Sequence, residues 1–320
     1  MQPLSDVVVV DFTRYLPGAY ACREFSRLGA RVVRVEPPEG DPMRLTATHW
    51  DTAFRVGSES VVCDLKADAS FARALCARAD VVLEGFRPGV AARLGIGPAD
   101  VPETTVYCSI TGFGVDHAHR ARAGHDVNYL GWAGALEDTA PTLPPIQVAD
   151  LAAGALGAVT RVLAALLERA RTGRGARLVV SMTHRSHDLV AHRLGGEPVP
   201  KLLTGGLACY RIYGTSDGRH VTVGALEPKF FRRLCELLER PELADRQYDE
   251  DQEALAADLS AVFASRSLDD WLECLGDEDV CVGPVSTREE AAHAFGSAET
   301  PLPVPLGAHT ESWLRELGLA

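Results

Sequence analysis

The stretch DVVVVDFTRYLPGAYACREFSRLGARVVRVEPP, residues 6–38, decides the fold, because it places one helical pattern between two β-branched runs. Residues 6–12 form a short and nearly continuous apolar run, which is typical of a strand buried on both faces. Pro17 can open a helix and Gly29 can close it. Residues 31–38 follow as a second strand that ends at two prolines. This β-α-β order predicts a parallel sheet.

The same alternation continues through the first 182 residues. Strand-like runs recur at residues 60–65, 80–86, 104–110 and 176–182, and helical patterns lie at 69–79 and 150–172. The last of these helices is rich in Ala and Leu and is followed by Gly173, a common residue after a helix C-terminus. We therefore predict that residues 1–182 form a large Rossmann-like α/β domain with a parallel sheet.

The second half of the chain has a different pattern. Residues 183–204 include a segment rich in Gly and Pro and are predicted to be a linker. The alternating residues 209–226, around the turn SDG, predict a β-hairpin. Helical patterns at 228–239 and 253–277 and a short strand at 279–285 follow. These elements predict a smaller α+β domain over 205–290, and we expect the C-terminal residues 298–320 to complete the large domain.

The composition argues against several classes of partner. The 320-residue chain has a net charge of −12 and an isoelectric point near 5.3, so nucleic acid and membrane surfaces, which are polyanionic, are not expected partners. A local cluster of arginines can still bind a small anion. None of the eight cysteines forms a C-x-x-C pair, and we see no signal peptide. We therefore expect reduced thiols and a cytoplasmic location.

No common local motif identifies the chemistry. The sequence has no P-loop, no H-E-x-x-H pair, no G-x-S-x-G elbow and no zinc-ligand spacing, so no metal site is expected. It also has no G-x-G-x-x-G turn after the first strand, which argues against a dinucleotide site. The remaining acid–base candidates are His125, Asp126, Asp150 and Glu227. Taken singly, His125 can be a solvated loop residue, Asp150 a helix N-cap, and Glu227 part of a solvated turn.

Several blocks in a fixed order carry more information than any single residue. They are residues 7–44, 64–97, 106–114 (VYCSITGFG), 122–130 (RAGHDVNYL), 172–182 (TGRGARLVVSM), 205–231 and 306–318 (LGAHTESWLRELG). In this order they resemble the class III CoA-transferase family, also called CaiB/BaiF, over nearly the whole chain. The resemblance implies an enzyme that acts on acyl-CoA. It also implies an interlocked homodimer, and the linkers at 183–204 and 286–305 fit such an arrangement.

That family contains two main chemistries, and the resemblance implies residues for both. In the CoA-transferases, the aspartate that corresponds to Asp150 is a nucleophile that forms an acyl anhydride. In the α-methylacyl-CoA racemase branch, Asp150 would act as an acid or base, paired with His125 of the G-H-D motif. Glu227 would contact this histidine from the partner subunit. The presence of all three favours a racemase or epimerase, because the transferases usually lack the histidine.

The chemistry of inversion agrees with this assignment. Inverting a carbon next to a thioester requires a base on one face and an acid on the other, and His125 and Asp150 can exchange these roles. Partial burial would raise the pKa of Asp150 toward neutrality. The resemblance places Asp126 at the start of a helix, where its N–H can donate to the thioester oxygen as an enolate forms. No metal or redox cofactor is required, because CoA enters as part of the substrate.

Three arginines are candidates for binding CoA. Arg14, Arg34 and Arg87 lie at or just after predicted strand ends, where α/β proteins usually bind ligands, and a guanidinium binds phosphate in a bidentate way. The resemblance implies that Arg34 and Arg87 contact the nucleotide part and that Arg14 lies near the ligand. The alternative for each is an ordinary surface salt bridge.

One segment departs from the family pattern. Members usually carry a basic GKRS-like stretch where this chain has VGSES, residues 56–60, so expected contacts to the CoA phosphates are missing. The acyl group can instead be carried by another pantetheine carrier, such as an acyl carrier protein. A non-catalytic relative that only binds such a carrier is a further alternative, although the retained His125, Asp150 and Glu227 argue against it.

Overall fold

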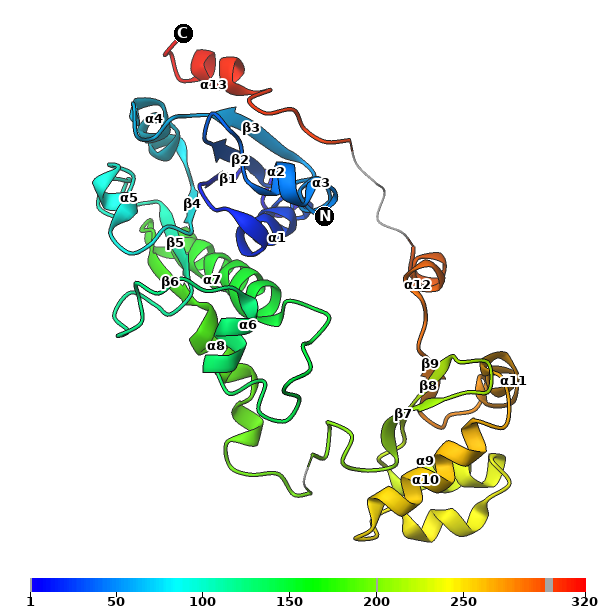
Figure 1. Ribbon diagram of the computed structural model, residues 1–320. Coiled ribbons are helices and arrows are strands. Elements are labelled where there is room, and N and C mark those ends of the chain that lie inside the picture. Colours follow the sequence, from blue (N-terminus) through cyan, green and yellow to red (C-terminus); the bar gives the residue numbers. More distant parts are fainter. Residues whose placement is uncertain (1, 200, 297–301) are drawn as a thin grey trace. The chain divides into compact units, whose positions relative to one another are not determined.

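The computed structural model describes residues 2–199, 201–296 and 302–320, and the chain divides into two units (Figure 1). The first unit extends to His192 and includes the described C-terminal residues 302–320, and the second begins at Arg193. The predicted C-terminal return to the large domain is therefore seen for residues 302–320. Residues 298–301 of that prediction lie outside the described residues.

The first unit is built around a six-stranded parallel sheet. Its strands are β1 (Val8–Asp11), β2 (Arg31–Glu36), β3 (Ser58–Val62), β4 (Val81–Glu84), β5 (Val106–Thr111) and β6 (Arg177–Ser181). Their order is β3-β2-β1-β4-β5-β6, and all five pairings are parallel. This is the doubly wound order, so the Rossmann-like prediction is confirmed. The strand order reverses between β1 and β4, and such sheets bind ligands at the carboxyl ends of the strands at that point.

Helices cover both faces of this sheet. They are α1 (Tyr15–Arg27), α2 (Met43–Thr46), α3 (Thr48–Phe54), α4 (Ser70–Arg78), α5 (Val90–Arg93), α6 (Asp126–Trp132), the π-helix η1 (Ala149–Leu156), α7 (Gly157–Thr172), α8 (Met182–Leu189) and the C-terminal α13 (Thr310–Glu316). Successive strand residues point to opposite faces. Val9 therefore packs in one core with α1 and α7, and Val10 packs in the other with α4 and Trp313 of α13. Burial on both faces explains the continuous apolar run in β1.

The structure corrects several expected boundaries. The helix expected over 150–172 begins as the π-helix η1 and continues as α7, which ends at Gly173 with φ +72°. This apolar helix is long enough to cross a membrane by length and composition, but it packs against α1 and the sheet. The linker expected from residue 183 starts with α8 instead. Ser181 caps that helix by accepting the His184 N–H at 3.3 Å. Only one narrow face of α8 is buried, so its sequence lacks the apolar periodicity that predicts a helix.

The second unit is a smaller α+β body, as predicted. Its antiparallel sheet contains β7 (Tyr210–Gly214), β8 (His220–Gly224) and β9 (Val282–Pro284). Its helices are α9 (Pro228–Leu237), α10 (Gln252–Phe263), α11 (Leu268–Leu275) and α12 (Arg288–Phe295), with a 3₁₀ turn at Pro241–Arg246. Another 3₁₀ turn, Ala191–Arg193, lies at the boundary between the two units. The helix expected over 253–277 is two helices. The first helix, α10, ends at Phe263, and Ser267 then caps α11 in a capping box with Asp270.

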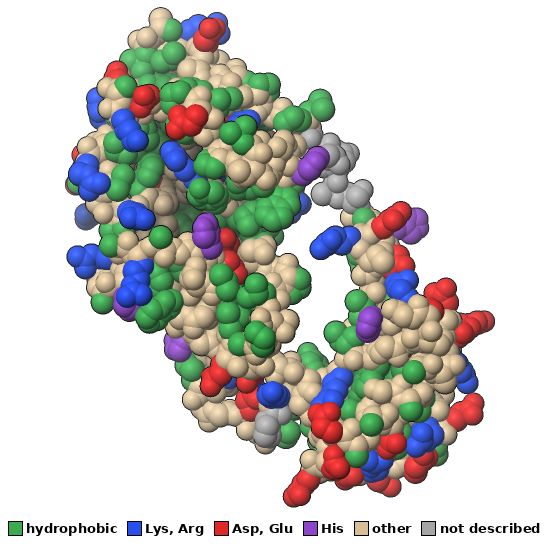
Figure 2. All heavy atoms as spheres, in the orientation of Figure 1, with side chains coloured by type: hydrophobic (Ala, Val, Ile, Leu, Met, Phe, Trp, Pro, Cys, Tyr) green, Lys and Arg blue, Asp and Glu red, His purple; other side chains and the backbone are tan. Residues whose placement is uncertain are grey.

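The two units differ in charge. Most of the net charge of −12 lies in residues 193–299. Figure 2 shows Asp and Glu side chains over much of the visible face of the second unit, whereas Lys and Arg side chains gather along one flank of the first. The second unit therefore repels an anionic ligand, whereas the first unit carries little net charge and has a cationic flank.

Candidate active site

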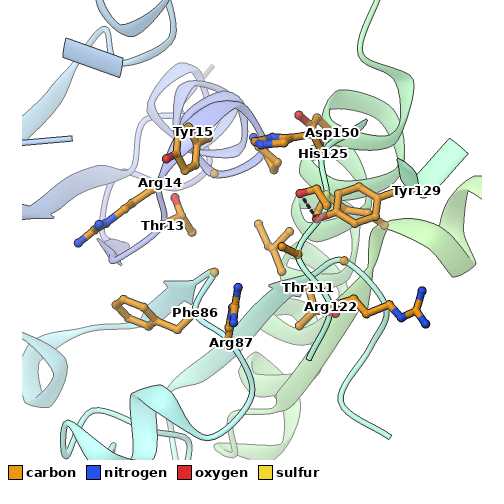
Figure 3. Close-up of a pocket in the computed structure, with 18 of the residues that line it drawn as sticks. Thr13, Arg14, Tyr15, Phe86, Arg87, Thr111, Arg122, His125, Tyr129 and Asp150 are labelled. Carbon is orange, nitrogen blue, oxygen red and sulfur yellow. Dashed lines mark hydrogen bonds between the residues drawn. The ribbon is translucent and has the colours of Figure 1, made fainter. Parts of the chain in front are cut away.

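A cavity of about 300 Å³ lies in the first unit, at the carboxyl ends of β1, β4 and β5 (Figure 3). It brings together His125, Asp150, Arg14 and Arg87 from four separate parts of the chain. This position agrees with the ligand site expected where the strand order reverses. Sequence reasoning could name these residues but could not show that they share one cavity.

His125 is presented by the turn that precedes α6. It is the N-cap residue, in an extended conformation, and its N–H donates to Asn128 Oδ1 at 3.0 Å. The imidazole is exposed, and its ring lies edge-on to that of Tyr15 with 6.3 Å between the ring centroids. Figure 3 shows both rings bordering the cavity. The backbone bond fixes the turn while the ring stays available to exchange a proton with a ligand.

Two glycines let the His125 turn lie directly on Tyr129. A Cβ on Gly124 would be 2.8 Å, and one on Gly112 would be 2.5 Å, from Tyr129 Cε1, which is too close for packed carbon atoms. The Tyr129 hydroxyl donates to the Gly124 carbonyl at 2.6 Å. The glycine that precedes the histidine is therefore required by packing. Sequence reasoning missed Tyr129, although its position four residues after His125, one helical turn away, was a usable signal.

Asp150 lies in the first turn of η1. Its N–H donates to Asp126 Oδ1 at 2.9 Å, so the carboxylate of Asp126 caps this helix from α6. Burial, together with the nearby charge of Asp126, raises the pKa of Asp150 from 3.8 to about 7. Burial also raises the pKa of Asp126, and the N–H groups of Asp150 and Ala149 oppose that change. Asp150 can therefore hold or release a proton near neutral pH.

The β1–α1 turn forms the wall of the cavity opposite these groups. Thr13 is fixed by Asp11, whose Oδ1 accepts the Thr13 N–H at 2.8 Å and its hydroxyl at 2.5 Å. Thr13 also occupies the space where a Cβ of Gly18 would lie, since that atom would be only 1.5 Å from Thr13 Oγ1. Tyr15 follows with φ +64°, a left-handed conformation that is costly for a non-glycine residue, and it is 48% exposed. Sequence reasoning missed Tyr15.

The turn after β4 carries Arg87. Glu84, the last residue of the strand, is buried, and its Oε2 accepts the Phe86 N–H at 2.7 Å. Burial raises the pKa of this carboxyl. The bond shapes the turn so that Arg87 points into the cavity, as Figure 3 shows. Arg87 is exposed rather than held in a buried ion pair, so it can bind an anionic ligand.

A second cavity of about 650 Å³ adjoins the first, because Arg14 and Arg87 line both. Lys66 and Arg93 also line it, so four cationic side chains border a nucleotide-sized space. Three carboxylates also line it: Glu36, whose oxygens are bonded to Arg44 at 2.6 Å, Asp64, whose Oδ1 accepts the Lys66 N–H at 3.0 Å, and Glu39. The arrangement suits a phosphate-rich ligand that extends from one cavity into the other.

Arg34 does not line either cavity. It is 2% exposed, and its guanidinium is held by Asp51 Oδ1 at 2.7 Å and by Glu36 at 3.2 Å. The same buried network includes Arg55, which joins Asp11 at 2.7 Å and Asp41 at 3.0 Å. A strand-end position alone could not separate an arginine that binds ligand from one buried in an ion cluster. This cluster instead supports the β1–α1 turn through Asp11.

Glu227 belongs to the second unit. It is exposed and directly precedes Pro228, the first residue of α9. Its contact with a histidine of the partner subunit stays a prediction. Two further arginines that sequence reasoning did not select, Arg120 and Arg122, border the cavity. The guanidinium of Arg122 lies 5.6 Å from the ring centroid of Trp132, and Figure 3 shows its side chain directed away from Arg87.

Within residues 2–199, 201–296 and 302–320, no three His, Cys, Asp or Glu side chains gather in a way that could hold a metal ion. The groups that the two cavities do bring together are the acid–base residues His125 and Asp150 and the cationic side chains of Arg14 and Arg87.

Comparison with known proteins identifies the family of the chain. The pattern of CoA-transferase family III matches residues 4–304. Human α-methylacyl-CoA racemase is 31% identical, over 99% of this chain and 94% of that protein. Mouse succinyl-CoA:glutarate CoA-transferase is 29% identical, over 91% of this chain and 73% of that protein. The crystal structure of Rv3272 from Mycobacterium tuberculosis superposes with a TM-score of 0.82 at 26% identity, covering 98% of this chain and 99% of that one.

The doubly wound sheet is thus that of an enzyme family whose members include α-methylacyl-CoA racemases and CoA-transferases. The chain belongs to CoA-transferase family III, which includes both racemases and CoA-transferases.

Proposed function

We propose that this enzyme racemises or epimerises α-branched acyl-CoA thioesters by 1,1-proton transfer. The observation that carries the proposal is that His125 and Asp150 line one cavity from different elements, and that the pKa of Asp150 is raised to about 7. Inversion of an acidic carbon requires two acid–base groups, one to remove the proton and one to return it. The relation to human α-methylacyl-CoA racemase supports the same assignment.

The reaction proceeds through an enolate. His125 removes the α-proton, and the C–H electron pair forms the carbon–carbon double bond while negative charge moves to the thioester oxygen. Protonated Asp150 then delivers a proton to the opposite face, the oxygen charge returns, and the thioester is restored with inverted configuration. The two residues exchange roles for the other enantiomer. Asp126 is the first residue of α6, and we assign its N–H to the enolate oxygen.

The cationic walls would hold the CoA part of the substrate. Arg14 and Arg87 lie where the two cavities meet, and Lys66 and Arg93 extend the positive charge into the larger one. We place the pantetheine at the junction and the phosphates in the larger cavity. No separate cofactor enters the scheme. We also propose a homodimer in which Glu227 of the second unit orients His125 of the other subunit and stabilises its charged form.

CoA transfer through an Asp150 anhydride is the second candidate, and the relation to the mouse transferase favours it. A pKa of about 7 leaves both the ionised and the protonated form of Asp150 present near neutral pH, so its protonation state fits either chemistry. The observation that favours proton transfer is His125, a second acid–base group in the same cavity. A thioester on an acyl carrier protein is a variant of the first candidate, and its substrate would enter the same cavity.

The test is α-proton exchange in deuterated water, followed by NMR, with (2R)- and (2S)-2-methylacyl-CoA. We expect deuterium to enter both enantiomers at the α-carbon, and His125→Ala to abolish the exchange. His49→Ala is the matched control, because His49 is exposed on α3 and lines neither cavity. Exchange of neither enantiomer, with CoA passing to an added carboxylic acid and hydroxylamine trapping Asp150, would establish the transferase instead. Exchange only with carrier-bound substrate would assign the carrier variant.

A further inference from the structure

The first turn of η1 has an uncommon geometry. Residues Ala149–Leu156 form a π-helix, which is rare in proteins and is often found at functional sites. At the start of any helix the first N–H groups have no partner within the helix. In this helix the Asp150 N–H donates at 2.9 Å to the Asp126 carboxylate, which is 24 residues away in the sequence.

The buried side of the same helix is tightly packed. Ala149 and Ala155 are completely buried, and Ala153 is nearly so. A Cβ on Gly154 would be 3.0 Å from Met182 Cγ and 3.2 Å from the Ala149 carbonyl oxygen. The helix therefore has little freedom to move toward the sheet or α8. The direction of its first turn, which sets where the Asp150 side chain enters the cavity, depends on how the N-terminal N–H groups are held.

Asp126 is placed to link the two acid–base groups. It follows His125 directly in the chain and begins α6, so its backbone shares the turn that presents the imidazole. Its side chain bonds to the backbone of Asp150. One residue is therefore joined covalently to one proton-transfer group and by a hydrogen bond to the other. Proton transfer depends steeply on such geometry, because small displacements of a reacting group cost large factors in rate.

We propose that the carboxylate of Asp126 is a positioning group for Asp150: by capping the π-helix it fixes the distance and direction of Asp150 relative to His125. This role belongs to the side chain and is separate from the backbone N–H of the same residue. The positioning role rests on the proposed function, because it requires that Asp150 transfers a proton. The cap itself is a property of the fold.

The experiment compares Asp126→Ala, which removes the cap, with Asp126→Asn, whose Oδ1 can still accept the Asp150 N–H. The first readout is hydrogen–deuterium exchange of the backbone amide of Asp150, which needs no substrate. We expect Asp126→Ala to speed this exchange by about 10-fold and Asp126→Asn to preserve its protection. The second readout is the steady-state α-proton exchange of the substrate. We expect Asp126→Ala to lower kcat by about 10–100-fold with KM within about 2-fold, and Asp126→Asn to restore most of kcat.

Asp251→Ala is the matched control. Asp251 caps α10 by accepting the Ala254 N–H at 3.0 Å, and it lines neither cavity. We expect this variant to lose thermal stability, as cap removal does, with kcat unchanged. Full amide protection or full kcat in Asp126→Ala would overturn the proposal. So would an Asp126→Asn enzyme that keeps the amide protected but loses kcat as fully as the alanine variant, since Asp126 would then act through its charge. If the wild-type enzyme exchanges no α-proton, the proposed function fails, and the amide exchange alone decides the cap.

Discussion

Replacing Asp150 with Asn tests whether the fold holds this carboxyl in its protonated form. Asn has nearly the shape of a protonated Asp and cannot ionise. Burial and the charge of Asp126 raise the pKa of Asp150 from 3.8 to about 7, so the folded enzyme holds the proton more tightly than the unfolded chain does. Removing the ionisable group therefore removes a free-energy cost that is present wherever Asp150 is ionised in the unfolded chain, that is, above about pH 4.

The size of this cost follows from the two pKa values. Below about pH 4 both states are protonated, and the cost is absent. Between about pH 4 and pH 7 the folded state binds more protons than the unfolded state, so the free energy of unfolding falls as the pH rises. At 1.36 kcal/mol per pH unit, the cost reaches about 2 kcal/mol at pH 5.5 and about 4 kcal/mol at pH 8, where it levels off. The difference in free energy of unfolding between Asp150→Asn and wild type should therefore shift by about 2 kcal/mol in favour of the variant from pH 5.5 to pH 8.

Urea unfolding followed by circular dichroism at pH 5.5 and pH 8 measures this gain. Asp116→Asn, which removes an exposed carboxylate from a loop, controls for the change in net charge. A stability difference between Asp150→Asn and wild type that is the same at both pH values would refute the reasoning, because it would mean that folding does not change the proton affinity of Asp150. The variant should also lose racemisation, so a gain in stability would accompany a loss of function.

Three further predictions concern the walls of the cavities. Arg87→Ala should raise KM for acyl-CoA by about 10–100-fold with kcat nearly unchanged in initial-rate assays, because a charge-assisted phosphate contact is lost; an unchanged KM would remove Arg87 from the binding site. Gly18→Ala should lower the free energy of unfolding in urea by about 1–3 kcal/mol or more, because its Cβ would be 1.5 Å from Thr13 Oγ1, and a neutral effect would contradict the packing. Tyr15→Gly should raise Tm by about 2–4 °C in scanning calorimetry, because glycine adopts the φ of +64° without strain, and it should lower the rate of substrate α-proton exchange. A lower Tm would show that the Tyr15 backbone is not strained.

Local sequence patterns determined the layers of the large domain. The β-branched runs and their helical separators are short-range features, and burial on both faces of β1, β2 and β4 leaves a continuous apolar signal that needs no tertiary information. The turn SDG likewise predicted the hairpin β7–β8. The family resemblance rested on blocks spread along the chain, and it named His125 and Asp150 without any geometry.

The tertiary structure alone decided which residues share a site and in what state. Arg34 and Arg87 both follow the rule for strand ends, yet one is sealed in an ion cluster and the other faces the cavity, since only packing determines which charges are paired. The π-helical start of η1, the strained Tyr15 and the cap from Asp126 depend on contacts between distant segments, which short-range patterns do not encode. The raised pKa of Asp150 has the same origin, because burial and a neighbouring charge exist only once the chain has folded.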